Sequence, residues 1–479
     1  GGAGSPPLPP PVGGVAAYRA DRPLVTAPAP LPPPAAADAD LGPPPVPVPQ
    51  GDGVFVSTLP SGLRVATRPL PGSACATVGV LLAHGSRDER AGERGAAHLA
   101  EAAAFQSAGG RSGAEIAASI ERMGGAADCS VGRESAVYFL DVMRSELAGA
   151  TELLADAVLR PELHEEDVAG AAARLGFHWE DTPPFAKLQE ATNAAAYGKV
   201  DGEEQGLGWP HLCDPAAAAA LTPAALRKFV ERAAAPENIV VAAAGADHDE
   251  MVRLARRYFH TETASTTATT PRRPAVYTGG RILLSVPPPA EPAPVPDPTH
   301  VSLSFPLAGG WHSPRLIAAC VLQQLLGGGS SFSAGGPGKG MYSRLYREVL
   351  NRHHWAESAE ATTAIHDDHG LLGMAGSALP VHGPARAGDL VRIFAEQWYR
   401  AATRDATDEE VSRAKNMLKC NVLTQLEGRL VQFEDVGRQV STYGKREGPE
   451  ELCEQIDAVD AAAIRGVAEG AVFGHPPTL

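Results

Sequence analysis

Cysteine is scarce in this sequence and widely spread. The 479 residues include six cysteines, which form no CxxC pair and no cluster: Cys75, Cys129, Cys213, Cys320, Cys420 and Cys453. This spacing excludes zinc fingers and a disulfide framework, and it favours a reducing compartment, where thiols stay free. With 44% hydrophobic residues, the chain is long enough for two or more domains that each have a core.

Long apolar runs and positive charge are also lacking. A helix needs about 18 to 20 apolar residues in succession to cross a bilayer, and the longest candidates here, residues 239–246 and 316–321, fall short. Any membrane association is therefore expected to run through other subunits. Lys and Arg number 41 against 56 Asp and Glu, a net charge of −15, which argues against a nucleic-acid partner and favours a cationic ligand.

The most informative feature that is present is a glycine-rich segment, residues 327–340, with the sequence GGGSSFSAGGPGKG. Glycine loses more conformational freedom on folding than any other residue, so such a run beside a helix indicates a backbone that must stay mobile or approach another group closely. We predict a working loop. An ordinary surface connection is the alternative that composition alone would favour.

Two phosphate-binding patterns fail in this segment. A Walker A site needs a glycine five residues before Gly-Lys and a hydroxyl residue after it, but Ser333 precedes Gly338-Lys339 and Gly340 follows. The dinucleotide pattern needs a third glycine where Met341 stands. A nucleotide cofactor is therefore not indicated.

Proline and hydroxyl residues mark the domain organisation. Residues 1–50 hold 16 of the 43 prolines and predict an extended arm, because proline interrupts helices and central strands. The arm begins Gly-Gly without methionine, as removal of an N-terminal targeting segment would leave it. A Thr-rich stretch predicts a linker at 261–278 between domains at 51–260 and 279–479. A proline run at 287–298 predicts a surface excursion.

The two halves repeat the same order of elements. Residues 77–82 are β-rich and lead to a helix around 95–105, while residues 301–305 alternate as in a strand before a helix over 316–326. This order indicates an internal duplication. Strands and helices mix without strict βαβ regularity, so the predicted fold class is α+β, with an antiparallel or mixed sheet in each half.

Local signals agree with this fold class. Ser112 with Glu115 forms a capping box, and residues 136–142 read as a strand. Residues 239–244, IVVAAA, predict a buried strand, and Asp247 predicts the start of the helix that follows.

A zinc motif is present but incomplete. His98 and Glu101 share a helical face with position 102, the spacing by which an H-x-x-E-H motif supplies two imidazoles and a carboxylate base. Position 102 is alanine. Because catalytic zinc needs three protein ligands and an open position, His98 and Glu101 are predicted to be relics that pack or hydrogen-bond, with no metal and no catalytic residue in this chain.

These motifs resemble those of a known family. GAAHLAEAAAF at residues 95–105 resembles the zinc-motif helix of the pitrilysin-type peptidases. The glycine-rich segment, KGMYSRLYREVLNRHHW at 339–355, the stretch 212–259 and DDHGLL at 367–372 resemble the alpha subunits of mitochondrial processing peptidases within that family. The resemblance covers about nine-tenths of the chain. The family's third ligand, a glutamate, would fall by spacing at Trp179, one residue before Glu180.

The resemblance carries implications for fold and function. It implies two homologous α+β domains in a clam-like arrangement, and a non-catalytic subunit that binds Arg-rich presequences for a zinc-bearing beta subunit. It also implies a location on the matrix side of the mitochondrial inner membrane, peripheral to it through partner subunits, and a place as a core subunit of the cytochrome bc complex, respiratory complex III.

The resemblance also implies the substrate-binding residues. The acidic pair Asp367 and Asp368 matches carboxylates linked to the basic residues of the presequence, and such carboxylates would make charge-assisted hydrogen bonds with arginine. The glycine-rich segment matches a loop that screens or guides the presequence, with these residues: Gly327, Gly328, Gly329, Ser330, Ser331, Gly335, Gly336, Gly338, Lys339 and Gly340.

Three functions stay open at this point. The first is the presequence-binding subunit, the second a purely structural core subunit of the cytochrome bc complex, and the third a self-sufficient zinc peptidase. The intact glycine-rich segment favours the first over the second, and Ala102 counts against the third.

Overall fold

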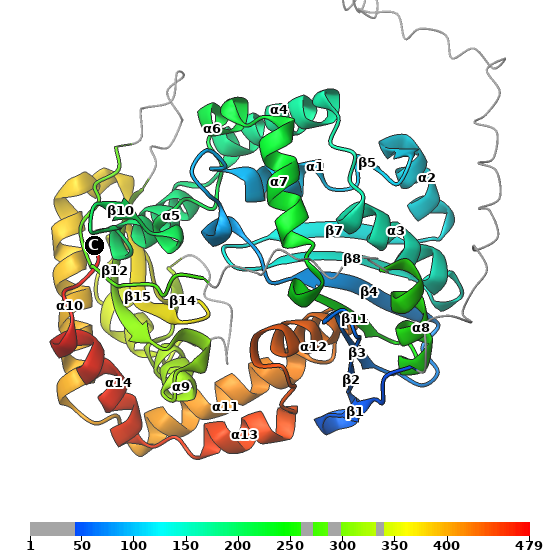
Figure 1. The fold of residues 1–479 in the computed structure, drawn as a ribbon. Coiled ribbons are helices and arrows are strands. Elements are labelled where there is room, and N and C mark those ends of the chain that lie inside the picture. The colour runs from blue at the N-terminus through cyan, green and yellow to red at the C-terminus, as the bar shows by residue number, and fades with distance from the viewer. Residues whose placement is uncertain (1–43, 260–271, 286–297, 332–339) are drawn as a thin grey trace, which may run out of the picture. The chain divides into compact units, whose positions relative to one another are not determined.

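The computed structural model describes residues 44–259, 272–285, 298–331 and 340–479 (Figure 1). Most of the predicted arm, the first part of the predicted linker, the proline run at 287–297 and four of the predicted loop residues lie outside these ranges. Those four are Gly335, Gly336, Gly338 and Lys339.

The first half is built on a seven-stranded mixed sheet. Its strand order is β1-β2-β3-β11-β4-β8-β7, antiparallel except for the parallel pair β3 and β11. The strands are β1 (Val48–Pro49), β2 (Phe55–Thr58), β3 (Arg64–Arg68), β4 (Cys75–Leu82), β7 (Ala126–Val131), β8 (Ala136–Met143) and β11 (Ile239–Ala244). The buried strand predicted at 239–244 is thus confirmed as β11.

Helices cover one face of this sheet (Figure 1). The helices of the first half are α1 (Ala96–Ala103), α2 (Gly113–Arg122), α3 (Leu147–Leu159), α4 (Glu165–Asp181), α5 (Pro184–Ala196), α6 (Pro215–Ala220), α7 (Pro223–Ala233) and α8 (His248–Tyr258). Of these, α1, α2, α3 and α8 contact strands of the sheet, and α4 and α7 pack against α1. Short ladders pair β5 (Ser107–Ala108) with β6 (Arg111–Ser112), and β9 (Lys199–Val200) with β10 (Glu203–Glu204). The predicted capping box is present, since Ser112 Oγ accepts the Glu115 N–H.

The second half is built on a four-stranded antiparallel sheet, in the order β12-β15-β14-β13. Its elements are β12 (Thr299–Ala308), α9 (Leu316–Leu326), β13 (Gly328–Ser330), the short π-helix η7 (Tyr346–Leu350), β14 (Ala356–Ile365), β15 (His369–Ala378), α10 (Ala387–Thr403), α11 (Asp408–Gln425), α12 (Arg429–Tyr443), α13 (Pro449–Asp457) and α14 (Ala461–Gly474). The mixture of sheets and helices in both halves confirms the α+β prediction.

The two sheets share a connection pattern that supports the duplication. In the first, β11 lies between β3, to which it is parallel, and β4, to which it is antiparallel. In the second, Thr478 lies between Gly280, in a parallel bridge, and Ser304 of β12, in an antiparallel bridge. The strands that follow are also equivalent in order: β4, β8 and β7 are successive neighbours in the first sheet, as β12, β15 and β14 are in the second. The strand β13 has no counterpart beside β7 among the described residues.

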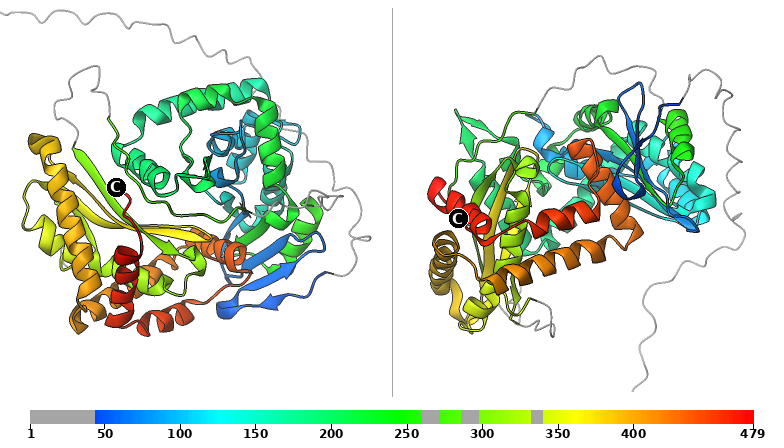
Figure 2. Two further views of the ribbon diagram at one scale, coloured as in Figure 1. Left: turned by 60° about the vertical axis from the view of Figure 1, so that its left-hand side comes forward. Right: turned by 90° about the horizontal axis from the view of Figure 1, so that it is seen from below.

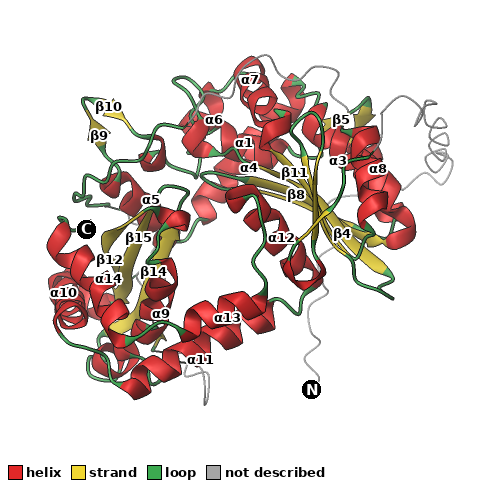
Figure 3. Ribbon diagram, turned by 60° about the horizontal axis from the view of Figure 1, so that its bottom comes forward, coloured by secondary structure: helices red, strands yellow, loops and turns green. Residues whose placement is uncertain are grey.

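Helix α12 belongs to the second half by sequence but packs on the first sheet (Figures 2 and 3). Phe433, Val436 and Val440 are buried against Val240, Ala242 and Ala244 of β11. The alternate residues of β11 face the helices of the first half, so this strand is covered on both sides. The first half likewise contributes a helix to the second sheet, because α5 packs against β12.

The end of the predicted linker is firmly held. Arg272 donates to both Asp88 carboxylate oxygens and to the carbonyls of Ala83 and Glu134. The Ala275 N–H donates to Asp368 at 2.7 Å. Residues 272–278 therefore tie the two halves together, which the composition of a Thr-rich linker did not indicate.

Candidate functional site

The helix that carries the incomplete zinc motif is α1. It begins after Gly95, whose φ of 84° favours glycine. Its first turn is capped by Glu89, whose carboxylate accepts the N–H groups of Gly95 at 3.0 Å and Ala97 at 2.9 Å. Burial raises the pKa of Glu89 to about 7, although these hydrogen bonds oppose the rise. Sequence reasoning missed this cap, because Glu89 lies outside the usual capping-box spacing.

His98 is engaged as a hydrogen-bond acceptor. Its Nδ1 accepts the backbone N–H of Cys213 at 3.0 Å, and its ring centroid lies 5.8 Å from that of His211. Burial, followed by the neighbouring His211 and His178, lowers the pKa of His98 to about 4. The imidazole is therefore neutral near pH 7, with Nδ1 fixed in a structural contact.

The remaining motif positions are also held by the surrounding backbone. Glu101 Oε2 accepts the N–H of Val131 in β7 at 2.7 Å, and burial raises the pKa of this carboxyl. The carbonyl of Ala102 accepts a hydrogen bond from Arg174 of α4 at 2.7 Å. The motif face of α1 thus stabilises its neighbours.

The donor set does not fit catalytic zinc. Three protein ligands are needed, and the helix supplies one imidazole, since position 102 has no ligating atom. Where the family spacing predicts a third ligand, Trp179 lies with its ring 4.9 Å from the Lys187 ammonium, and Glu180 is exposed. Within the described residues, no group of three or more His, Cys, Asp or Glu has a geometry that could hold a metal ion.

A pH dependence of stability follows from His98. Because its folded pKa of about 4 lies below the unfolded value of about 6.5, its contribution is complete above pH 6.5 and is lost as the pH falls towards 4. His98→Asn keeps an acceptor near Nδ1 but does not titrate. We expect its free energy of unfolding to fall less between pH 7 and pH 4.5, by about 1–3 kcal/mol, in urea denaturation. The same change at exposed His164 is the control, and identical slopes for wild type and His98→Asn would contradict the prediction.

The glycine-rich segment starts as the C-terminal cap of α9 and continues into β13. The Gly327 N–H donates to the carbonyl of Gln323 at 2.7 Å, with φ of 56°. Gly328 and Gly329 then pair with β14. The described start of this segment is therefore an edge strand, which the prediction of a mobile loop did not include.

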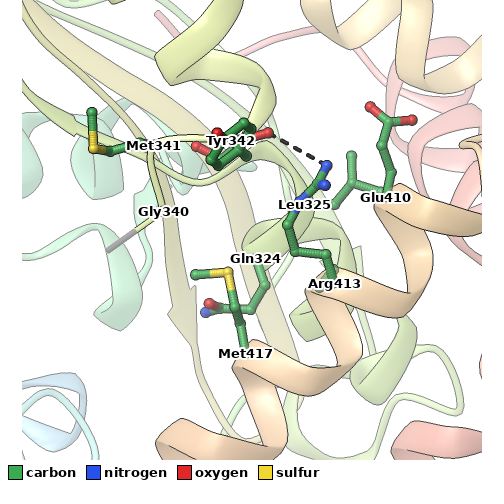
Figure 4. A pocket seen from close by; sticks show the side chains of 10 residues that line it. Gln324, Leu325, Gly340, Met341, Tyr342, Glu410, Arg413 and Met417 are labelled. Atoms are coloured by element: carbon green, nitrogen blue, oxygen red, sulfur yellow. Dashed lines mark hydrogen bonds between the residues drawn. The ribbon is translucent and has the colours of Figure 1, made fainter. Parts of the chain in front are cut away.

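At the other end of the segment, Gly340 lines a pocket of about 120 Å³ next to α11 (Figure 4). Two of its lining residues are bonded to each other, since Arg413 donates to the carbonyl of Tyr342 at 3.5 Å. The lining residues are Gln324, Leu325, Gly340, Met341, Tyr342, Ser343, Glu410, Arg413, Ala414 and Met417.

The acidic pair occupies the turn between β14 and β15, but its two carboxylates have different surroundings. Asp368 binds Arg87 through two parallel hydrogen bonds of 2.7 and 2.9 Å. Burial opposes its ionisation, but the bonds from Arg87 and Ala275 outweigh burial and hold its pKa below the ordinary value. Asp367 is 45% exposed and lies 3.2 Å from His312. Asp367 is thus the more accessible of the two.

The acidic pair lies away from residues 327–331, the described start of the glycine-rich segment. The strand β13 pairs with residues 358–360 near the start of β14, and the acidic pair follows its end at Ile365. At about 3.4 Å per residue, the two features are roughly 20 Å apart along the same strand. A ligand that reaches both must be extended or several turns long.

Comparison with known proteins decides the family. A family model described as insulinase (Peptidase family M16) matches residues 64–199, and one described as Peptidase M16 inactive domain matches residues 220–418. The Neurospora crassa mitochondrial-processing peptidase subunit alpha is 32% identical, over 88% of this chain and 83% of the relative. The chain belongs to the M16 peptidase family. The human mitochondrial-processing peptidase subunit alpha is 35% identical, over 88% of this chain and 80% of the relative.

A solved structure has a similar fold over most of the chain. A protease from Helicobacter pylori superposes with a TM-score of 0.74, covering 89% of this chain and 98% of its own, at 18% identity. This likeness confirms the two-domain α+β architecture expected from the sequence. The relatives named above confirm the expected resemblance to mitochondrial-processing peptidase alpha subunits. The residues matched from the sequence to the family's zinc motif are His98, Glu101 and Ala102, and the Ala102 side chain has no atom that could ligate a metal.

Proposed function

We propose that this chain is the non-catalytic alpha subunit of a mitochondrial processing peptidase, which binds Arg-rich presequences for cleavage by a zinc-bearing beta-type subunit. The observation that carries the proposal is the state of the motif helix, in which position 102 is alanine and His98 Nδ1 accepts the backbone N–H of Cys213. The names of the relatives support the same assignment.

In this proposal the chain contributes the glycine-rich segment and the acidic pair to presequence binding. Asp367 offers its carboxylate to an arginine of the substrate, while Asp368 fixes the turn through Arg87. The chain needs no cofactor of its own, and zinc is placed in the partner. The net charge of −15 supports attraction of a cationic peptide.

The proposed location is the mitochondrial matrix, peripheral to the inner membrane through partner subunits. Among the described residues, no helix is both long and apolar enough to span a bilayer. A place as a matrix-side core subunit of respiratory complex III is part of the proposal. It is tested by separating native membrane complexes by size and identifying the neighbours of this chain.

We expect the purified chain to contain less than about 0.1 zinc per molecule, since three ligands are needed for a catalytic ion, and to leave a synthetic presequence uncut. Addition of a beta-type partner should produce cleavage. Asp367→Asn should then raise KM several-fold with little change in kcat. The reason is that the lost interaction would hold the substrate equally in the ground state and in the transition state. Metal analysis and a cleavage assay measure these quantities, and cleavage by the isolated chain would overturn the proposal.

A further inference from the structure

The edge strand β13 is held by backbone pairing on one side and by a side-chain hydrogen bond on the other, where the Gly328 N–H donates to Ser343 Oγ at 3.0 Å. It pairs antiparallel with β14 over three residues, and the pairing is extended by bonds from Ala361 N–H to Gly327 O at 2.8 Å and from Ser331 N–H to Glu357 O at 2.7 Å. Gly328 and Gly329 have no side chains to bury. Because packing of side chains supplies much of the stability of a sheet, these two glycines add little to the attachment of the strand beyond their backbone hydrogen bonds.

The backbone of β13 is also irregular. Gly328 and Gly329 have φ values of 106° and 155°, far from the roughly −140° of a regular antiparallel strand. A Cβ on Gly328 would lie 2.0 Å from the carbonyl oxygen of Ala359. An ordinary peptide in regular β conformation could pair with β14 without this irregularity, by the strand addition that sheet edges allow.

The residue opposite Gly328 is Glu360. Since the neighbouring pairs Gly327–Ala361 and Ser331–Glu357 are hydrogen-bonded, the pair Gly328–Glu360 is non-hydrogen-bonded, the type in which opposed side chains lie closest. Gly328 presents no side chain to Glu360 at this place. Burial raises the pKa of Glu360.

A second carboxylate lies on the same strip of β14. Glu357 accepts a hydrogen bond from Ser377 Oγ at 3.1 Å, and Ser377 Oγ lies 2.7 Å from Ser358 Oγ. The strip therefore offers carboxylates and hydroxyls next to an exchangeable backbone edge. Arginine suits such a strip, because it makes charge-assisted hydrogen bonds to carboxylates.

We propose that the β14 edge is a binding site for an extended arginine-containing peptide, which displaces β13 and places an arginine opposite Glu360. The identity of this peptide as a presequence rests on the proposed function. In the free chain β13 occupies the edge, so binding must first release it, and the apparent affinity is lower than that of an open edge.

A cross-link between the strands tests the displacement. Ser330 and Ser358 form a non-hydrogen-bonded pair, whose Cβ separation is near that of a disulfide. The double variant Ser330→Cys and Ser358→Cys is made in the full chain with exposed Cys420 changed to Ser. A fluorescent presequence peptide should bind at least 10-fold more weakly to the oxidised form, with recovery on reduction. Equal Kd values for the two forms, with the disulfide verified by mass spectrometry, would overturn the proposal.

A second measurement applies even if the cross-link does not form. Glu360→Gln should weaken binding of the arginine peptide about 5- to 10-fold and leave a citrulline version unchanged, while Glu409→Gln, at an 87% exposed side chain, is the matched control. Equal effects on both peptides would reject the arginine contact. Both tests use the chain without a partner. The two proposals can therefore fail separately. If the peptide binds at β14 but is not cleaved after a beta-type subunit is added, the proposed function is wrong and the binding site is still supported.

Discussion

Replacement of Arg87 by alanine is expected to lower the free energy of unfolding by about 3–5 kcal/mol, the cost of removing one partner of a buried ion pair. The Arg87 side chain is 5% exposed and binds the carboxylates of Glu134 and Asp368. It also donates to the carbonyl of Arg273 at 2.8 Å. Without it, two partly buried carboxylates face each other between the halves. Urea denaturation followed by circular dichroism measures the change.

The control for this prediction is Arg273→Ala, because Arg273 pairs with Glu203 through a side chain that is 87% exposed. Such a surface pair contributes about 0–1 kcal/mol. The pKa of Asp368 is depressed in the folded chain, so its contribution is present above the ordinary carboxyl pKa of about 3.9. That contribution is lost as the pH falls through the lowered pKa. The difference between wild type and Arg87→Ala should therefore shrink in acid. A loss near pH 7 no larger than that of Arg273→Ala would show that Arg87 does not hold the halves together.

Phe433→Ala is expected to cost about 3–5 kcal/mol of unfolding free energy, as for other buried aromatic side chains. Phe433 is fully buried between α12 and the first sheet. A Cβ on Gly79 of β4 would lie 2.5 Å from its ring, and a Cβ on Gly437 would lie 2.2 Å from Leu81. The two surfaces therefore interlock, and loss of the ring leaves a cavity that the sheet cannot close.

The matched control on the same helix is Val431→Ala, at a side chain that is 38% exposed. A surface change of this kind usually stays within about 0.5 kcal/mol. Thermal and urea unfolding should separate the two variants clearly. If Phe433→Ala were as stable as Val431→Ala, α12 would not be a structural part of the first half.

Local patterns in the sequence predicted the elements well. The capping box at Ser112 and the buried strand at 239–244 were both confirmed, because caps and apolar runs depend on residues a few positions apart. The sequence also shows that the zinc motif is incomplete, because one ligating side chain is missing at position 102. The domain boundaries and the substrate-binding residues stay predictions.

The contacts between distant segments could not be read in this way. The sequence pointed to Asp368 as a ligand for substrate, but the structure pairs it with Arg87, 281 positions away. The glycine-rich segment was expected to be a loop, but its first residues pair with β14. The hydrogen-bond partners of His98 and Ala102 are Cys213 and Arg174. The sequence around these two partners contains no pattern that would have predicted the contacts.

The sequence by itself determined the α+β class, the order of the elements, the family resemblance and the absence of a second imidazole. These properties depend on residue type and short spacing. Only the tertiary structure decided which half α12 covers, which carboxylate of the acidic pair is accessible and what lies beside β14. Those outcomes depend on contacts between buried surfaces and charged groups that are hundreds of residues apart in the sequence. Such contacts are determined by burial and geometry in the folded chain and not by local sequence patterns.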